Sequence, residues 1–555
     1  MEGDDANPKG GLFGKKVTVQ TDRGAVKGKY QGDVAVFHSV PFAAPPVGDL
    51  RFRAPKDVEP WEGTLDASGL KAICPQVSLK QGSYLYLGEE DCLHMHVYAP
   101  KKAIEGGEKL PVMFWIFGGA YDMGDGIEFG FYDGQQLADE YGVVVMAPNY
   151  RVGPFGFLAS EALRDEDADG STGNMGVRDQ RMALDFAKRN AAAFGGDPDR
   201  ITIFGESAGG FSVCYHVSHG AYSDLFTAAI MESGSCDTTE FFLQPREAFN
   251  VGKLLIEAIG CEEDDLECLR ALEPKDILYG VLSSLKTRDV TDENGLPVLT
   301  PIGTWGPVID GTTVGLPKMP LQAIEAGEGV QVPMLLGTNH NEGSIFVPAV
   351  HVVFPHMGLK FTDEDLEVVL HHVLDPRLGR AGVPPTVAPV MAQYPKDDFK
   401  SQDERFATLI RDYIFVCPTR RVARAVSAYS DAYLYHFTYP EHWLENKVLG
   451  EYHSSELTFV FGNKLPFFYH HWNKDDYAMK ALIQGYWTTF AKTHDPNPAT
   501  EALDAGNFTQ GVHWPAWASA ADEGGANIYL DVVPTTDTGF MKDNCDFFDD
   551  YLHDH

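Results

Sequence analysis

The sequence Ile-Thr-Ile-Phe-Gly-Glu-Ser-Ala-Gly-Gly, from Ile201 to Gly210, decides the fold. Its first four residues are apolar or β-branched and predict a buried strand. The next five match the pattern G-x-S-x-G, with serine at position 207, and the run Phe211 to His219 that follows is compatible with a helix. This pattern presents a nucleophile when it lies in a sharp turn between a strand and a helix. Ser207 is therefore a candidate catalytic nucleophile.

The glycines on either side of Ser207 explain why such a turn is possible. Glycine lacks a Cβ atom, so the backbone can turn tightly there and another chain segment or a substrate can come close. We expect the hydroxyl at the C-terminal edge of the sheet, facing the N-terminus of the next helix, whose dipole favours negative charge. A pattern with three fixed positions also arises by chance, so the assignment depends on partners elsewhere in the chain.

The composition sets limits on partners. The chain has 555 residues, of which 44% are hydrophobic, so it can bury a large core. Acidic side chains number 80 and basic ones 44, which gives a net charge of -36. This balance argues against binding to nucleic acid or to an anionic membrane surface, because both would be repelled. It favours a soluble, self-repelling surface, and it permits a cationic substrate without implying one. No apolar run has the length of a membrane span.

The N-terminus leaves the cellular compartment open. Residues 1–14 are polar and rich in glycine, and we expect a loose tail there. The stretch Met1 to Asp5 is acidic and lacks the apolar core of a secretory signal. Two alternatives follow, a cytosolic protein or one from which a signal has been removed.

Eight cysteines are too few for a disulfide scaffold in a chain of this length. Two pairs would each close a short loop: Cys74 with Cys92, and Cys261 with Cys268. The other four are scattered along the chain: Cys214, Cys236, Cys417 and Cys545. Cys214 lies in the expected helix after Ser207 and is interpreted as a small core residue.

An α/β pattern begins at about residue 93. Short apolar runs predict strands at His94 to Tyr98, Val112 to Phe117, Val143 to Ala147, Ile201 to Phe204, Ala228 to Met231, Met334 to Leu336 and Tyr433 to Phe437. Helical patterns lie between several of them, notably at Val177 to Arg189. Strands that alternate with helices predict a largely parallel sheet covered on both faces.

Two parts of the chain do not fit this alternation. At the N-terminal end, Val17 to Gln20 and Ala25 to Tyr30 are interpreted as a β-hairpin. The intervals 240–330 and 345–430 have helix-like periodicity with Pro and Gly breaks. We interpret them as helical insertions over the C-terminal edge of the strands, where they would form the walls of a cleft. Residues 15–555 are thus expected to form one elaborated domain.

Six motifs in one order together resemble the type-B carboxylesterase/lipase family, which includes cholinesterases, animal carboxylesterases and fungal lipases. They are Glu90-Asp91-Cys92-Leu93, Gly118-Gly119-Ala120, Asn149-Tyr150-Arg151-Val152-Gly153, Gly173 to Gln180, Phe194 to Pro198 and Gly205 to Gly209. The resemblance runs from roughly Thr18 to Trp517. It implies an α/β-hydrolase fold and the hydrolysis of carboxylic esters, without a cofactor. Together with the paired cysteines, it favours an oxidising environment and the secretory pathway.

The resemblance also supplies partners for Ser207. In α/β-hydrolases the chain order is nucleophile, acid, histidine. The stretch Gly337 to Gly343 matches the family's acid motif and assigns Glu342 as the acid. The stretch Gly450 to Leu457 resembles the histidine loop and assigns His453 as the general base. His340 competes locally, but it precedes the acid and so breaks this order.

The oxyanion hole should consist of backbone N–H groups, because these can approach the carbonyl oxygen closely. The family's positions carry over to Gly119, Ala120 and Ala208. Many relatives have His or Tyr where this chain has Phe117, and the change removes a polar side chain near the site.

Supporting polar residues are expected around the nucleophile. Glu206 is interpreted as a hydrogen-bonded structural carboxylate, with the ordering of a water or a local negative potential as alternatives. Ser233 and Ser235, which follow another predicted strand, are interpreted as supports for the catalytic residues.

Metal sites are not predicted. Four residues have the spacing that begins a calcium loop: Asp165, Asp167, Asp169 and Gly170. The twelfth position of that loop would be Gly176 instead of Glu, so we expect no calcium there. The pairs His371-His372 and His470-His471 have no companion at metal-ligand spacing.

The main prediction is a serine carboxylesterase that acts on a small-molecule ester. In cholinesterases, which this chain resembles, the equivalent loop carries a Trp that binds a quaternary ammonium, and in fungal lipases it forms a long lid. Here the loop between Cys74 and Cys92 has no Trp and spans 18 positions (92 minus 74), so the resemblance favours neither a choline esterase nor a lipase with a long lid. A lipase or sterol esterase for longer acyl chains is the alternative enzyme, and a non-catalytic adhesion or binding protein is the alternative from another class. The complete set Ser207, Glu342 and His453 argues against the latter. Substrate and oligomeric state stay open.

Overall fold

Within the residues that the structure describes, thirteen strands form one sheet. The structure is a computed structural model, and it describes residues 15–80, 83–238, 241–284, 304–348, 362–374, 387–440, 446–463, 472–497 and 511–554. The expected N-terminal tail and the pair His470-His471 lie outside these ranges. The strands follow the order β1-β2-β3-β7-β9-β8-β10-β11-β12-β13-β14-β15, with β4 beside β2.

Every predicted strand is present, and several more were not predicted. The predicted ones are β1 (Lys16–Gln20), β2 (Ala25–Gln31), β7 (His94–Pro100), β8 (Leu110–Ile116), β9 (Val144–Pro148), β10 (Gly196–Glu206), β11 (Ala228–Glu232), β12 (Met334–Asn339) and β13 (Ala432–Phe437). The others are β3 (Val34–Pro41), β4 (Thr64–Asp66), β14 (Ala526–Leu530), β15 (Thr535–Thr538) and a separate hairpin of β5 (Gln76–Lys80) and β6 (Ser83–Leu87).

The centre of the sheet is parallel and its two edges are antiparallel. All neighbours from β9 to β14 pair in parallel. The pairs β1–β2, β2–β3, β3–β7, β7–β9 and β14–β15 are antiparallel. Strand β7 therefore departs from the predicted parallel series. The connection to β8, residues 101–109, is shorter than the dozen or more residues that a parallel crossover needs.

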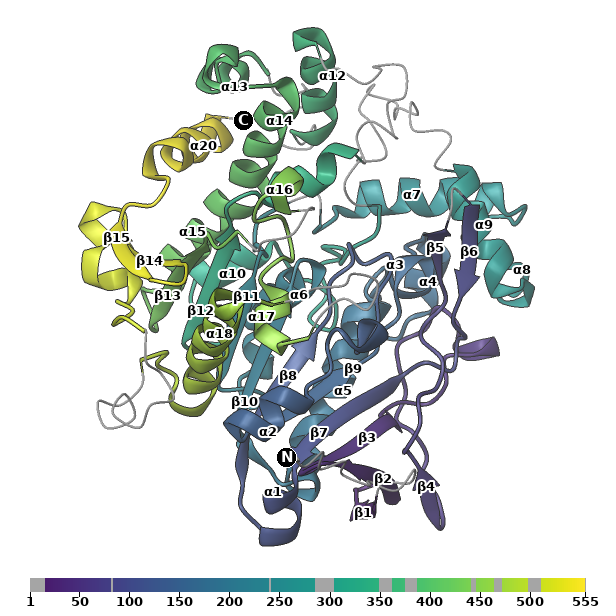
Figure 1. Cartoon of the computed structure of the whole chain (residues 1–555). Coiled ribbons are helices and arrows are strands. Elements are labelled where there is room, and N and C mark those ends of the chain that lie inside the picture. Colours follow the sequence, from purple (N-terminus) through teal and green to yellow (C-terminus); the bar gives the residue numbers. More distant parts are fainter. Residues whose placement is uncertain are drawn as a thin grey trace, which may run out of the picture.

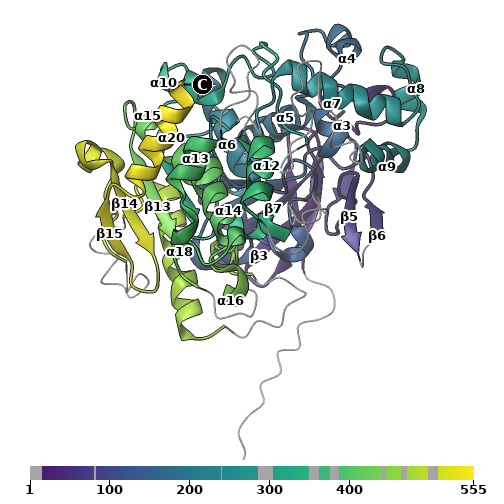
Figure 2. The same cartoon turned by 90° about the horizontal axis from the view of Figure 1, so that it is seen from above.

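Helices cover both faces of this sheet, as predicted. Helices α5 (Met175–Asn190), α6 (Ala208–Ser218) and α15 (Cys417–Val426) pack on one face, and α2 (Gln135–Tyr141) and α18 (Lys474–Thr493) on the other. Figure 2 shows α5 and α6 on one side of the sheet and α18 on the opposite side. Three short elements near the site are η2 (Glu128–Gly130), η6 (Glu342–Ile345) and α17 (Leu457–Phe461).

The two intervals that fit the sheet poorly contain several helices in their described parts. The first contains α7 (Pro245–Ala258), α8 (Leu266–Ala271), α9 (Pro274–Ser284) and α10 (Pro320–Glu325). The second contains α12 (Asp363–Val373), α13 (Ala388–Gln393), α14 (Gln402–Ile410), the π-helix η11 (Arg411–Val416) and α15. Figure 1 shows α7 and α12 to α14 on the side toward which β8 and β10 run. Helix α15 instead packs on β12 and β13 of the sheet.

A buried ion pair joins two of the sequence motifs. Arg151 follows β9, and its Nε and Nη2 atoms donate to the Asp179 carboxylate on α5 at 2.7 and 2.6 Å. Both side chains are almost completely buried. Another guanidinium nitrogen donates to the carbonyl of Arg53 at 2.8 Å. The pair fixes α5 against the segment that follows β9.

All eight cysteines form disulfides. The two predicted bonds are present, Cys74–Cys92 and Cys261–Cys268. Cys214 lies in the buried core, as predicted, and it also bonds Cys236, which was not predicted and ties α6 to the segment after β11. The fourth bond joins Cys417 on α15 to Cys545 near the C-terminus. These two pairs depend on contacts between distant segments, which cysteine spacing does not reveal.

Loop length should order the contributions of three of these bonds to stability. We expect replacement of both cysteines by alanine to lower the free energy of unfolding by about 2 kcal/mol for Cys261–Cys268, about 3 for Cys214–Cys236 and about 5 for Cys417–Cys545. The bonds span 7, 22 and 128 positions, and a longer closed loop restricts the unfolded chain more. Urea unfolding of the three double variants checks the order. Equal losses, or the largest loss for Cys261–Cys268, would contradict it.

Candidate active site

Ser207 occupies a strained turn between β10 and α6. Its φ of 56° and ψ of -125° are uncommon for a residue with a side chain. The turn is fixed by a hydrogen bond of 3.0 Å from the Ser207 N–H to the carbonyl of Glu232. A Cβ atom at Gly209 would lie 1.9 Å from the carbonyl oxygen of Ile116, so only glycine lets α6 begin this close to β8. From Ile201 to His219, Ser207 alone is partly exposed and every other residue is buried.

Glu342 and His453 meet close to the ends of the parallel strands. Glu342 opens η6 directly after β12, and His453 lies in the loop before α17. The Nδ1 atom of His453 lies 2.6 Å from Oε2 of Glu342, and both side chains are buried. A parallel β-bridge between Asn341 and Tyr452 holds the two loops together beside this contact.

The second oxygen of Glu342 is also fixed. The Ser233 hydroxyl donates to Oε1 at 2.6 Å, and the backbone N–H of Asn339 donates to the same atom at 2.7 Å. Ser233 thus contacts the proposed acid directly. Ser235 does not share this contact, and its hydroxyl instead forms a hydrogen bond with Thr238.

Glu206 lies on the other side of the imidazole. Its Oε1 atom is 3.2 Å from Nε2 of His453 and accepts a hydrogen bond of 2.6 Å from the Ser454 hydroxyl. Within the described residues, neither Nε2 of His453 nor the Ser207 hydroxyl makes a hydrogen bond. The structure therefore joins His453 to Glu342, places Glu206 beside it, and does not link it to Ser207 by a hydrogen bond.

The charges around His453 act in opposite directions. Burial lowers the pKa of His453, but the negative charges of Glu206 and Glu342 outweigh burial and raise this pKa from 6.5 to about 9. Burial raises the pKa of Glu206 to about 7, against the stabilising effects of His453 and the Ser454 hydrogen bond. The two groups interact so closely that they titrate together.

Two more carboxyl groups lie behind this pair. Burial raises the pKa of Glu232 well above its usual range, and the charge of Glu456 adds to the effect. Burial also raises the pKa of Glu456 strongly, followed by the charges of Glu206 and Glu342. Glu456 is fixed by a short hydrogen bond from the Asn339 amide. The negative charge of Glu456 also contributes to the raised pKa of His453.

The loop after β8 presents free backbone donors beside α6. Gly119 and Ala120 have φ values of 103° and 54°, and within the described residues their N–H groups donate no hydrogen bond. Ala208 is the first residue of α6, where an N–H has no partner inside the helix. The buried hydroxyl of Tyr121 lies 3.2 Å from Ser212 Oγ on α6. This contact ties the loop to the helix that follows Ser207.

Aromatic rings enclose the site. The ring of Phe117 stacks on Tyr150 with a centroid distance of 4.1 Å, and the Tyr150 hydroxyl donates to the Phe117 carbonyl at 2.8 Å. The apolar residue at this position is therefore packed into the core. Phe415 of η11 and Phe346 lie with ring centroids 4.8 and 5.5 Å from that of His453. A π-turn inside a helix is a frequent feature of functional sites.

Backbone strain is concentrated here. Eleven residues other than glycine have positive φ in the described part of the chain. Five of them belong to the site: Ala120, Tyr121, Ser207, Ser233 and Ser454. Such conformations are unfavourable and persist only where the surrounding structure fixes them, which is typical of active sites.

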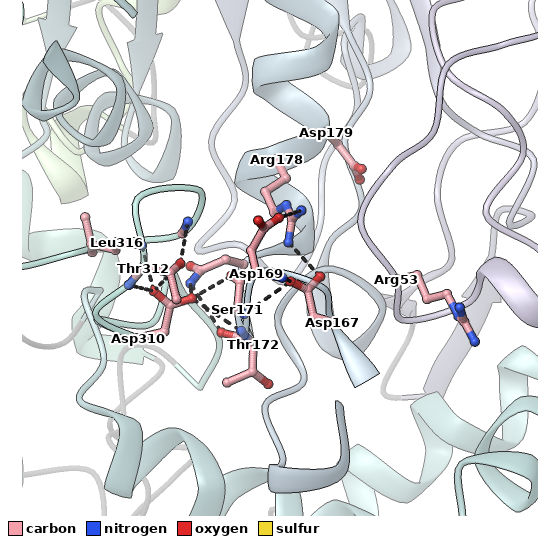
Figure 3. A network of polar contacts seen from close by, with 12 residues as sticks. Arg53, Asp167, Asp169, Ser171, Thr172, Arg178, Asp179, Asp310, Thr312 and Leu316 are labelled. Carbon is pink, nitrogen blue, oxygen red and sulfur yellow. Dashed lines mark hydrogen bonds and ion pairs between the residues drawn. The ribbon is translucent and has the colours of Figure 1, made fainter. Parts of the chain in front are cut away.

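The competing residues lie elsewhere. His340 forms a hydrogen bond of 3.2 Å with His436. The side chain of Asp167 accepts hydrogen bonds from the N–H groups of Asp169 and Ser171 and pairs with Arg178 at 2.9 Å, so its oxygens have partners within the protein (Figure 3). The described residues contain no cluster that could hold a metal ion, and the side chains of His371-His372 lie outside what the structure describes.

Sequence reasoning did not identify two residues of the site. Ser454 and Glu456 both lie in the quoted histidine loop, but no property of that loop alone indicates what their side chains contact. The signal for Ser454 is its position directly after His453, which limits how far its hydroxyl can lie from the imidazole. The contact of Glu456 with Asn339 depends on the packing of two distant segments.

Comparison with known proteins identifies the family. The model of the carboxylesterase family matches residues 15–548. Para-nitrobenzyl esterase of Bacillus subtilis is 35% identical over 511 residues, which cover 90% of this chain and 92% of that protein. Human bile salt-activated lipase is 32% identical, with 94% and 67% covered, and acetylcholinesterase of Leptinotarsa decemlineata is 30% identical, with 90% and 81% covered.

Solved structures agree with this result. A thermophilic para-nitrobenzyl esterase superposes with a TM-score of 0.77 at 32% identity, over 96% of this chain and 99% of that one. A Geobacillus stearothermophilus carboxylesterase also gives a TM-score of 0.77, at 28% identity and the same coverage. The predicted α/β-hydrolase fold is thereby confirmed. This chain belongs to the carboxylesterase family and is a serine carboxylic-ester hydrolase.

Proposed function

We propose that Ser207, His453 and Glu342 hydrolyse a small-molecule carboxylic ester through an acyl-enzyme. The observation that carries this proposal is the 2.6 Å contact between the Glu342 carboxylate and His453 Nδ1, close to a nucleophile turn in which Ser207 alone is partly exposed. The absence of a Ser207–His453 hydrogen bond within the described residues is compatible with it. Catalytic hydrogen bonds are often long without substrate and tighten in the complex.

Each group has a defined role in the proposed reaction. The Ser207 oxygen attacks the ester carbonyl while His453 Nε2 takes the hydroxyl proton, and Glu342 stabilises the imidazolium that forms. His453 then gives the proton to the leaving alcohol, and the acyl group stays on Ser207 as an ester. Water attacks this ester, passes one proton through His453 to Ser207 and releases the carboxylic acid.

The oxyanion of the tetrahedral intermediate requires donors that are free before substrate arrives. We assign this role to the N–H groups of Gly119, Ala120 and Ala208. Their lack of partners in the described residues supports the assignment. Each such donor contributes on the order of a hundred- to a thousandfold in rate.

The proposed substrate class is wider than a single ester. The apolar rings of Phe346 and Phe415 beside His453 favour esters with an apolar group. Hydrolysis of longer acyl chains, as in a lipase or sterol esterase, is the runner-up, and a p-nitrophenyl ester series separates the two by chain length. Four disulfides support an oxidising environment, and we propose action in the secretory pathway. No helix in the described ranges has the length and hydropathy of a membrane span.

Ser207→Ala tests the nucleophile. We expect the kcat for a p-nitrophenyl ester to fall on the order of a millionfold, because the covalent route is lost. The exposed Ser223 provides a matched control, and Ser223→Ala should hydrolyse the ester at the wild-type rate. A Ser207→Ala variant as active as wild type would refute the proposal. If a fluorophosphonate did not label the wild-type protein, a non-catalytic binding protein would be favoured.

Ser233→Ala tests how the acid is held. One charge-assisted hydrogen bond contributes about 1.5 kcal/mol, so we expect kcat to fall about tenfold with KM unchanged. The Asn339 N–H remains on the same oxygen and limits the loss. Ser235→Ala removes a nearby hydroxyl that does not contact Glu342 and should leave kcat within twofold. Equal effects of the two substitutions would argue against this role of Ser233.

The pH dependence of kcat/KM tests the base. His453 must be neutral to accept the Ser207 proton, and its raised pKa means that it becomes neutral only at higher pH than a free histidine. We therefore expect activity toward an uncharged ester to fall as the pH decreases, with the midpoint of this acid limb above 6.5. A midpoint below 6.5 would contradict the described arrangement of charges.

A further inference from the structure

Ser454 contacts the carboxylate that faces the proposed base. It follows His453 directly, and its hydroxyl donates to Glu206 Oε1 at 2.6 Å. The same oxygen lies 3.2 Å from Nε2 of His453. Two consecutive residues of one loop therefore hold a single carboxylate oxygen of β10 between them.

The backbone of Ser454 is held in a conformation that is uncommon for a residue with a side chain. Its φ is 76°, in the region that favours glycine, whereas Ser455 does not have a positive φ. Glycine at position 454 would relieve this strain. The strained conformation is therefore retained together with a hydroxyl that glycine or alanine would lack.

We infer that Ser454 is a positioning residue that holds the Glu206 carboxylate against Nε2 of His453, and thereby controls how strongly the imidazolium is stabilised during ester hydrolysis. This inference rests on the proposed function of His453 as the base. Ser454 itself does not contact the reacting atoms in this account. It acts only through Glu206.

The position of Glu206 determines how much negative charge lies near Nε2 of His453. Glu342 of η6 is fixed by Ser233 and Asn339 and cannot move away from the imidazole. Within the described part of the chain, Ser454 is the one side chain that donates a hydrogen bond to Glu206, so the distance of Glu206 from Nε2 depends on that donor. The other titratable groups that interact electrostatically with these residues are Glu456 directly before α17, Glu232 of β11, Tyr435 of β13 and Tyr132 after η2.

Loss of the Ser454 hydroxyl should lower the pKa of His453. The Glu206 anion would lose its donor, so it would take up a proton more readily or move away from His453. Either change removes negative charge from Nε2, and a histidine with less negative charge nearby becomes neutral at lower pH. The acid limb of kcat/KM should then move to lower pH.

The test compares pH profiles of kcat/KM for an uncharged p-nitrophenyl ester. Glu206→Gln should move the acid limb down by about one pH unit or more, because a neighbouring charge within about 4 Å shifts a pKa by that amount. Ser454→Ala and Ser454→Gly should move it in the same direction and by equal amounts, no further than Glu206→Gln. The double variant Ser454→Ala/Glu206→Gln should match Glu206→Gln alone.

Ser455 provides the matched control. It is the next residue, its hydroxyl is buried, and within the described residues that hydroxyl has no hydrogen-bond partner. Ser455→Ala should leave the acid limb unmoved. The position of the limb does not depend on how much enzyme is folded, so reduced stability of a variant does not obscure the result.

Three results would overturn the inference: an unshifted limb in Ser454→Ala, a shift in Ser454→Ala that Ser454→Gly reverses, or a double variant that shifts further than Glu206→Gln. The second would assign the effect to backbone strain. Fluorophosphonate labelling of the same samples separates this inference from the proposed function. Full labelling at Ser207 with an unshifted limb defeats only the role of Ser454, whereas no labelling of wild type defeats the proposed function.

Discussion

The structure depends on one sharp turn, in which a parallel strand becomes a helix within a single residue. Ser207 adopts a positive φ there, and the absence of a side chain at Gly209 lets the helix begin against the carbonyl of Ile116. The next two parallel strands, β11 and β12, bring Glu232 and the loop of Glu342 to the same edge. The buried pair Arg151–Asp179 fixes the supporting helix. The exposure of one hydroxyl follows from the close packing of everything around it.

The second constraint is electrostatic. Two carboxylates flank one buried imidazole, and each is hydrogen-bonded differently. Glu342 accepts two hydrogen bonds on one oxygen and contacts His453 with the other, so its position is fixed. Glu206 relies on Ser454. Both carboxylates favour the imidazolium form of His453. The proton transfers that we propose for His453 are therefore sensitive to the position of each carboxylate. Raised pKa values and strained backbone thus occur in adjacent residues of one site, in the pairs Glu206–Ser207, Glu232–Ser233 and His453–Ser454.

Much of this could be predicted from the sequence because it is local. The strand, turn and helix around Ser207, the central strands and the two short disulfide loops are encoded in contiguous segments. The assignments of Glu342 and His453 needed the resemblance, because a single Glu or His is uninformative among so many. The direction of β7, the Cys214–Cys236 bond and the contact of Ser454 with Glu206 depend on segments that meet only in the folded chain. Local pattern carries no information about such contacts.

The central claim is that an acyl group is carried by the Ser207 oxygen. Acid quenching of the enzyme during turnover of a slowly deacylating ester, followed by peptide mass mapping, tests it most directly. We expect one added acyl group, located on Ser207, that disappears when turnover is allowed to finish. An acyl group on any other residue, or turnover with no covalent species under conditions where release is slow, would contradict it.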